Sequence, residues 1–179
     1  MSDHSRREIF AGRIVQLGLE TATLPNGQTV ELEIIRHPGA AAVVPLHPDQ
    51  TVTLVHQYRH AGGGMHYEVP AGVLEANEAP VVCAARELSE EVQLHAERLI
   101  PLTKIHTTPG FTDEQIHLFL GLDLRPTNDA PEPDEYIQVV RLPLADALAM
   151  TADGRITDAK TICAPVSYTH LTLPTTPYV

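Results

Sequence analysis

The sequence has little of what nucleic-acid-binding and membrane-spanning proteins need. Its 179 residues include 12 Lys and Arg against 23 Asp and Glu, which gives a formal net charge of -11 at pH 7. Affinity for nucleic acid depends on a basic surface, which this composition does not supply. A membrane-spanning helix needs about 20 consecutive apolar residues, and no run in the chain approaches that length. We therefore expect a soluble protein without nucleic-acid or membrane partners.

Cysteine is scarce and tryptophan is absent. The two cysteines, Cys83 and Cys163, lie far apart without CxxC or zinc-type spacing, and the first ten residues, MSDHSRREIF, contain no apolar signal segment. Both features favour a cytoplasmic location, where thiols stay reduced. The ten histidines are scattered, and His56 and His60, the one pair four residues apart, fall where a strand passes into a loop. A histidine metal site is therefore not favoured.

The hydrophobic pattern predicts more strands than helices, without the regular alternation of a doubly wound protein. Pro25-Asn26-Gly27 predicts a hairpin turn, because Asn26 and Gly27 both tolerate positive φ. Segments rich in β-branched residues flank it at 9–15 and 29–35. Further strands are expected at 40–46, 51–57, 67–69, 115–124 and 136–142, with helices starting near 79, 144 and 158. The fold class is α+β in one domain, opening with an antiparallel β-hairpin or meander.

The segment 72–94 gathers five glutamates and one arginine. Pro80 suits the first turn of a helix, whose apolar face would comprise Val81, Ala84 or Ala85, Leu88 and Val92. Glu87, Glu90 and Glu91 share another face. Like charges on adjacent turns repel one another, so this face is either a solvated acidic surface or a site for a hard cation such as Mg²⁺ or Mn²⁺, which prefers oxygen ligands.

The same segment resembles the Nudix box, which runs Gly, five residues, Glu, seven residues, Arg-Glu, an aliphatic residue, any residue, Glu-Glu, any residue, Gly and an aliphatic residue. The residues in register are Gly72, Glu78, Arg86, Glu87, Leu88, Glu90, Glu91 and Leu94. A match of this length is far more specific than a short motif. The resemblance implies the Nudix fold, a mixed β-sheet sandwiched between helices.

The resemblance also implies a role for each matching residue. Glu87, Glu90 and Glu91 would bind the metal, and the main-chain carbonyl of Ala71 would add a ligand. In addition, Glu78 would pair with Arg86 and brace the loop against the helix, which keeps the ligands aimed.

One position departs from the box. Gln93 stands where the box has its second Gly, which ends the helix in the left-handed conformation. A non-Gly residue adopts that conformation at a cost of about 1 kcal/mol. We expect the change to affect stability more than metal binding, because Gln93 lies beyond the last ligand.

Segments outside the box resemble the ADP-ribose pyrophosphatase branch of this family. They are Gln57-Tyr58-Arg59, Glu68-Val69-Pro70-Ala71-Gly72, Thr108-Pro109-Gly110-Phe111-Thr112-Asp113-Glu114, Asp134-Glu135 and GRITDAKT at 154–161. Together they cover nearly all of residues 9–164. The resemblance implies an enzyme that hydrolyses ADP-ribose, or a related nucleoside diphosphate sugar, and gives AMP and ribose 5-phosphate from ADP-ribose. Residues 1–40 would form an N-terminal β-hairpin region and residues 41–165 the Nudix hydrolase domain.

Arg59 is the candidate cation for the diphosphate, because a guanidinium contacts two phosphate oxygens at once. The alternative is a side chain that only reaches solvent at a strand end. Glu68 is a second candidate for substrate binding, and Tyr58 is either a ligand or a core residue. Glu135, beside Asp134, is the candidate base that joins Glu90 and Glu91 as a catalytic residue, although loop acids also serve only as solubilising groups.

Two other functions stay open. A Nudix-fold sensor would bind ADP-ribose-type ligands without cleaving them, but all three ligand glutamates are present, which favours an enzyme. A hydrolase for GDP-mannose or another nucleotide sugar would need a different base site, and Phe10 is the only aromatic residue expected in the N-terminal sheet. The open edges of that sheet, and the two-fold interface of the resembled branch, predict a homodimer.

The composition changes abruptly at residues 166–179, which contain no charged residue and no helical period. Residues 166–175 resemble a translated transposase-type sequencing adapter. We therefore expect the helix that starts at Asp158 to be cut at Ala164 and Pro165, and residues 166–179 to be a non-native tail.

Overall fold

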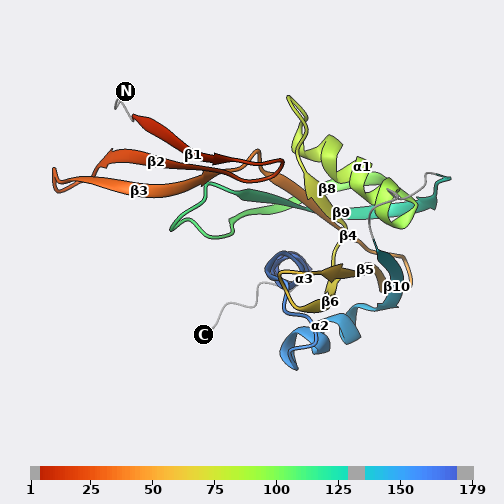
Figure 1. The fold of residues 1–179 in the computed structure, drawn as a ribbon. Helices are drawn as coiled ribbons and strands as arrows, with labels where there is room; N and C mark the ends of the chain where they lie inside the picture. Colours follow the sequence, from red (N-terminus) through yellow and green to blue (C-terminus); the bar gives the residue numbers. More distant parts are fainter. Residues whose placement is uncertain (1–4, 129–135, 173–179) are drawn as a thin grey trace.

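An antiparallel sheet of three strands opens the chain. The computed structural model describes residues 5–128 and 136–172, and in it β1 (Arg6–Ala11), β2 (Gln16–Thr23) and β3 (Thr29–Arg36) pair in that order. Gly27 adopts φ 83° in the turn between β2 and β3, which agrees with the Asn-Gly hairpin signal. This sheet extends away from the rest of the molecule (Figure 1). The expected meander is present.

The predicted strand at 9–15 is wrong in its second half. β1 ends at Ala11, and the N–H of Gly12 donates to the Val15 carbonyl at 2.8 Å, which closes a turn into β2. Glycine weakens the interior of a strand because it has no side chain to pack. Ile14 therefore lies in a turn rather than in a strand.

A mixed four-stranded sheet forms the centre of the molecule. Its order is β7 (Ala71–Val73), β4 (Ala40–Pro45), β9 (Gln115–Pro126) and β8 (Leu94–His106), with β4 and β9 parallel and the other pairs antiparallel. Every residue of β4 is buried, as expected for a strand covered on both faces. The sequence did not predict β8, whose side chains are mostly exposed and whose register shifts beside Pro101.

A second antiparallel sheet packs beside the central sheet. It consists of β10 (Ile137–Pro143), β5 (Thr51–Arg59) and β6 (Gly64–Glu68), and it confirms the strands predicted at 51–57 and 136–142. The strand predicted at 67–69 is wrong in its bounds, because β6 starts at Gly64 and ends before Val69. Successive residues of a strand face opposite sides of a sheet. Tyr58 and Arg59, at the end of β5, therefore point to opposite sides.

Helices cover both sides of the central sheet. α1 (Pro80–Val92) lies on one side, whereas α2 (Leu144–Ala152) and α3 (Ala159–Thr172) lie on the other (Figure 1). The alternation of β4 divides the core accordingly. Ala40, Ala42 and Val44 pack in the cluster that contains residues of α2 and α3, and Ala41 and Val43 in the cluster that contains residues of α1. The predicted α+β fold, a mixed sheet between helices, is confirmed.

The two ends of α1 lie where the sequence placed them. Pro80 starts the helix directly after Ala79, and Gln93 ends it in the left-handed conformation at φ 56° and ψ 40°. The apolar face differs from the prediction at its first residue. Val81 is 43% exposed, because burial against the sheet begins two residues later, at Cys83.

α3 continues past Pro165 to Thr172, so the expected end at that proline is wrong. An interior proline removes one backbone donor, which kinks a helix without always ending it. Residues 173–179 lie outside the described residues, and the origin of residues 166–179 stays a prediction. In the part of the chain that the structure describes, no helix is long and apolar enough to cross a membrane.

Candidate active site

Three carboxylates surround the guanidinium of Arg86. Its Nη1 donates to Glu87 Oε1 at 2.6 Å and to Glu90 Oε2 at 2.9 Å. Its Nε and Nη2 donate to the two oxygens of Glu78, each at 3.0 Å. The hydrogen bonds from Arg86, and after them the N–H of Glu75, lower the pKa of Glu78 to about 2. Arg86 therefore offsets the repulsion among the gathered charges and ties the loop before α1 to the helix.

Glu91 binds the edge strand β7. It is 6% exposed, and its Oε2 accepts the N–H of Ala71 at 3.0 Å. The next residue, Gly72, lies so close to α1 that an added Cβ would stand 1.8 Å from Glu87 Oε1. A side chain at this position would therefore displace the Glu87 carboxylate from its place beside the backbone of Gly72.

These groups share one cavity with Arg59. The cavity measures about 310 Å³ and is lined by Ile14, Arg59, Ala71, Gly72, Val73, Arg86, Glu87, Glu90 and Glu91. The sequence pattern did not predict Ile14 as a site residue; the turn between β1 and β2 brings it to the carboxylates. The available signal was an apolar residue in the turn that follows Gly12, where it cannot pack in a hydrophobic core.

A buried carboxylate holds Arg59. The Nε and Nη2 of Arg59 donate to Glu68 Oε1 and Oε2 at 2.9 and 3.0 Å, and Lys160 Nζ donates to the same Oε2 at 2.5 Å. Burial alone would raise the pKa of Glu68, but Arg59 and Lys160 together hold it at about 2. Glu68 lies under Arg59 and does not line the carboxylate cavity. Tyr58, on the other side of the sheet, does not line it either.

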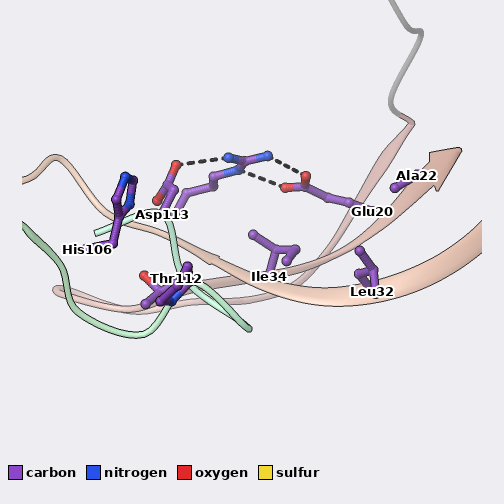
Figure 2. Close-up of a pocket in the computed structure, with 9 residues that line it drawn as sticks. Glu20, Ala22, Leu32, Ile34, His106, Thr112 and Asp113 are labelled. Carbon is purple, nitrogen blue, oxygen red and sulfur yellow. Dashed lines mark hydrogen bonds and ion pairs between the residues drawn. The ribbon is translucent and has the colours of Figure 1, made fainter. Parts of the chain in front are cut away.

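A second cavity, of about 330 Å³, lies against the N-terminal sheet. Figure 2 shows Glu20 and Asp113 facing each other across a guanidinium, which belongs to Arg36. Arg36 Nη1 donates to Asp113 Oδ2 at 2.9 Å, and the N–H of His37 donates to Asp113 Oδ1 at 2.8 Å. The N–H of Ile35 also donates to the Phe111 carbonyl at 2.8 Å. The Thr-Pro-Gly-Phe-Thr-Asp-Glu segment thus ties β3 to the body of the molecule.

The NUDIX domain family model matches residues 36–164, which are most of the chain. The chain belongs to the Nudix family. It is 41% identical over 166 residues to a Bacillus methanolicus protein named "Methanol dehydrogenase activator", with 92% of this chain and 89% of that protein covered. It is 37% identical over 169 residues to a Bacillus subtilis protein named "ADP-ribose pyrophosphatase", with 93% and 91% covered.

Two further comparisons bear on this Nudix chain. It is 38% identical over 136 residues to a Yersinia enterocolitica protein named "GDP-mannose pyrophosphatase", with 71% of each chain covered. A solved structure titled "Crystal structure of ADP compounds hydrolase" superimposes with a TM-score of 0.80 at 20% identity, covering 96% of this chain and 95% of that one. The superposition establishes the shared Nudix fold.

Within residues 5–128 and 136–172, no group of three or more His, Cys, Asp or Glu side chains is arranged to hold a metal ion. Arg86 binds Glu87 and Glu90, while the N–H of Ala71 binds Glu91. The chemistry of this Nudix donor set nevertheless fits a hard divalent cation, because three carboxylates on one helical face line one cavity. Asp134 and Glu135, the candidate acids of the loop before β10, lie outside the described residues.

Proposed function

We propose that this chain is a Mg²⁺-dependent hydrolase of the pyrophosphate bond in ADP-ribose or a related nucleoside diphosphate sugar. The products from ADP-ribose are AMP and ribose 5-phosphate. One observation carries the proposal: Arg59 lines a single cavity together with Glu87, Glu90 and Glu91. The guanidinium suits phosphate oxygens, and the carboxylates suit the cation that a diphosphate needs for hydrolysis.

The names of the relatives favour ADP-ribose over GDP-mannose. The Bacillus subtilis protein named for ADP-ribose aligns with 93% of this chain, whereas the protein named for GDP-mannose aligns with 71%. A sensor that binds without cleaving is disfavoured, because the three carboxylates stand together beside Arg59.

In the proposed mechanism, Glu87, Glu90, Glu91 and the main-chain carbonyl of Ala71 would hold Mg²⁺, for which Mn²⁺ would substitute. When bound, the ion supplies positive charge to the diphosphate and acidifies water. Arg59 binds phosphate oxygens. Because the protein has a net charge of -11, it needs such a local positive charge to bind an anion. Glu135 accepts a proton from the attacking water. The water oxygen bonds to one phosphorus as the bridging P–O bond breaks.

A coupled assay tests the substrate. Phosphate released by an added phosphatase would be measured with malachite green for ADP-ribose, GDP-mannose, ADP-glucose, NADH and 8-oxo-dGTP. We expect the highest kcat/KM for ADP-ribose. Binding of ADP-ribose without release of phosphate would identify a sensor, and a preference for 8-oxo-dGTP would refute the proposed substrate class.

Isosteric variants test the metal ligands. Glu90→Gln and Glu91→Gln each remove one carboxylate charge without a change of shape, so we expect turnover to fall by about 100-fold or more. Glu97→Gln is the matched control, because Glu97 is an exposed residue of β8 that pairs with Arg125. Near-wild-type turnover in the Glu90 and Glu91 variants would remove them from the metal site.

Glu135→Gln tests the base. A group that acts mainly in the transition state changes kcat more than KM. We therefore expect kcat to fall with KM nearly unchanged, and the opposite pattern would make Glu135 a binding residue.

We also propose a homodimer formed through the N-terminal sheet. All six residues of β1 are exposed, including the apolar Ile9 and Phe10, and an open strand with apolar side chains invites pairing. Light scattering should report a dimer at micromolar concentration, and a monomer there would refute the assembly.

A cytoplasmic location fits Cys83 and Cys163, which form no disulfide.

A further inference from the structure

A chain of polar contacts joins Arg59 to the first turn of α3. Glu68 binds Arg59 through both oxygens and also accepts Lys160 Nζ. Lys160 Nζ also donates to Asp158 Oδ1 at 3.0 Å. Asp158 Oδ2 in turn accepts the N–H of Thr161 at 2.9 Å, which caps the start of α3. The contact between Glu68 and Lys160 spans 92 residues of sequence, and the chain of contacts joins the edge of the carboxylate cavity to a helix cap.

The hydroxyl of Thr161 fixes this chain to the sheet. Thr161 Oγ1 donates to Asp158 Oδ2 at 2.6 Å and accepts the N–H of Val69 at 2.8 Å. Val69 directly follows Glu68, so both ends of the chain of contacts are attached to the end of β6. These hydrogen bonds, together with the peptide bond between Glu68 and Val69, form a closed ring through Lys160, Asp158 and Thr161.

Glu68 needs two cations because it is almost entirely buried. Its side chain is 4% exposed and that of Lys160 is 11% exposed, whereas 44% of the Arg59 side chain is exposed. A buried carboxylate requires charge compensation. If Arg59 were the only compensating cation, Glu68 would cancel the charge that Arg59 presents to an anionic substrate. Lys160 supplies a second positive charge from the far side, which it shares between Glu68 and Asp158.

Lys160 does not reach the substrate cavity. It lines a neighbouring cavity of about 410 Å³, together with Glu68, His66 and residues 157–159. Arg59 borders both cavities, so it separates Lys160 from the carboxylates of α1. Any effect of Lys160 on substrate binding therefore has to pass through Glu68 and Arg59.

We propose that Lys160 and Glu68 are positioning residues for the substrate: they fix the guanidinium of Arg59 at the cavity wall and keep its charge available to the diphosphate. This inference rests on the proposed function, in which Arg59 binds phosphate oxygens. It makes the first turn of α3 part of the binding machinery without contact to the ligand.

A lysine scan tests the proposal, because Lys104 and Lys160 are the only lysines of the chain. We expect Lys160→Met to raise KM for ADP-ribose by about two- to thirtyfold, the range seen for residues that act through a network. The value of kcat should change much less. Lys160→Arg should restore KM, because it keeps the charge. Lys104→Met removes the same charge from the exposed face of β8 and should leave KM unchanged.

A double-mutant cycle with Arg59→Met decides whether Lys160 acts through Arg59. If it does, adding Lys160→Met to Arg59→Met produces no further rise in KM. Additive effects, an unchanged KM in Lys160→Met, or a loss confined to kcat would each overturn the proposal. Thermal unfolding identifies a variant that fails to fold, in which case Lys160→Gln replaces Lys160→Met in the same cycle.

Binding without turnover separates the two proposals. Calorimetric titration with ADP-ribose in EDTA gives dissociation constants for the same variants when no hydrolysis occurs. If the wild-type chain binds ADP-ribose but never cleaves it, the proposed hydrolysis fails, and weaker binding by Lys160→Met still supports the positioning role. If the wild type cleaves ADP-ribose and Lys160→Met binds it equally well, only the positioning role fails.

Discussion

Replacing Gln93 with glycine should stabilise the protein without changing its activity. Gln93 adopts φ 56° at the end of α1, where its N–H bonds to the carbonyls of Leu88 and Ser89. The left-handed conformation costs an L-residue about 1–2 kcal/mol, and glycine avoids that cost. Glycine also gives the unfolded chain more freedom, which removes about 0.4–1 kcal/mol of the gain. The net increase in the free energy of unfolding is about 0–1.6 kcal/mol, with a central value of about 0.8 kcal/mol.

Thermal unfolding followed by circular dichroism measures this gain. For a chain of this length, 1 kcal/mol corresponds to a rise in Tm of about 2–4 °C. Gln93→Ala is the first control, since it removes the exposed side chain but keeps the Cβ that strains the backbone. Gln138→Gly is the second, because Gln138 lies in the extended strand β10, where glycine costs about 0.5–1 kcal/mol.

We expect a rise in Tm for Gln93→Gly alone. If Gln93→Ala gives the same rise, the side chain rather than φ is responsible, and the strain argument is refuted. Turnover should stay at the wild-type value, because Glu91 is held by the Ala71 N–H before the helix reaches Gln93.

Three further results are expected. Gly72→Ala should reduce turnover strongly at little cost in secondary structure, because an added Cβ would stand 1.8 Å from Glu87 Oε1. Kinetics equal to those of the wild type would show that the Glu87 carboxylate moves aside without loss of activity. Because the pKa of Glu68 is lowered from 4.5 to about 2, its stabilising charge is lost as pH falls through that window. Urea titrations between those pH values should therefore show a smaller loss of stability in Glu68→Gln than in the wild type, and equal losses would contradict the compensation by Arg59 and Lys160. Burial, followed by the charges of Glu87 and Glu78, raises the pKa of the Cys83 thiol to about 12, so Cys83 should react with iodoacetamide at pH 8 only after unfolding, as peptide mapping would show.

The sequence predicted elements whose signals are local. Pro80 marked the start of α1, and the position of Gln93 in the motif marked its left-handed end, because a cap and a missing N–H are properties of a few neighbouring residues. β8 was missed for the opposite reason. Its side chains are largely exposed and Pro101 interrupts its pairing, so tertiary contact with β9 rather than its own pattern makes it a strand.

The residues of the candidate site fall into the same two groups, those with a local sequence signal and those without one. Glu87, Glu90 and Glu91 were found because their spacing places them on one helical face. Ile14 and Lys160 were not found, because a turn of the N-terminal sheet and the cap of α3 reach Arg59 and its surroundings only in the folded chain. Sequence spacing has no information on such contacts until the topology is known.

The small side chains of β4 limit which substitutions this protein can accept. Three consecutive alanines, at 40–42, are buried, and their methyl groups are packed in the core clusters on the two faces of β4. Larger side chains there would overpack the core at about 1–3 kcal/mol each. Ala42 also pairs with Ala71, so any swelling would displace the N–H that holds Glu91. Directed-evolution libraries aimed at a new sugar should therefore leave this strand fixed and diversify the turn around Ile14.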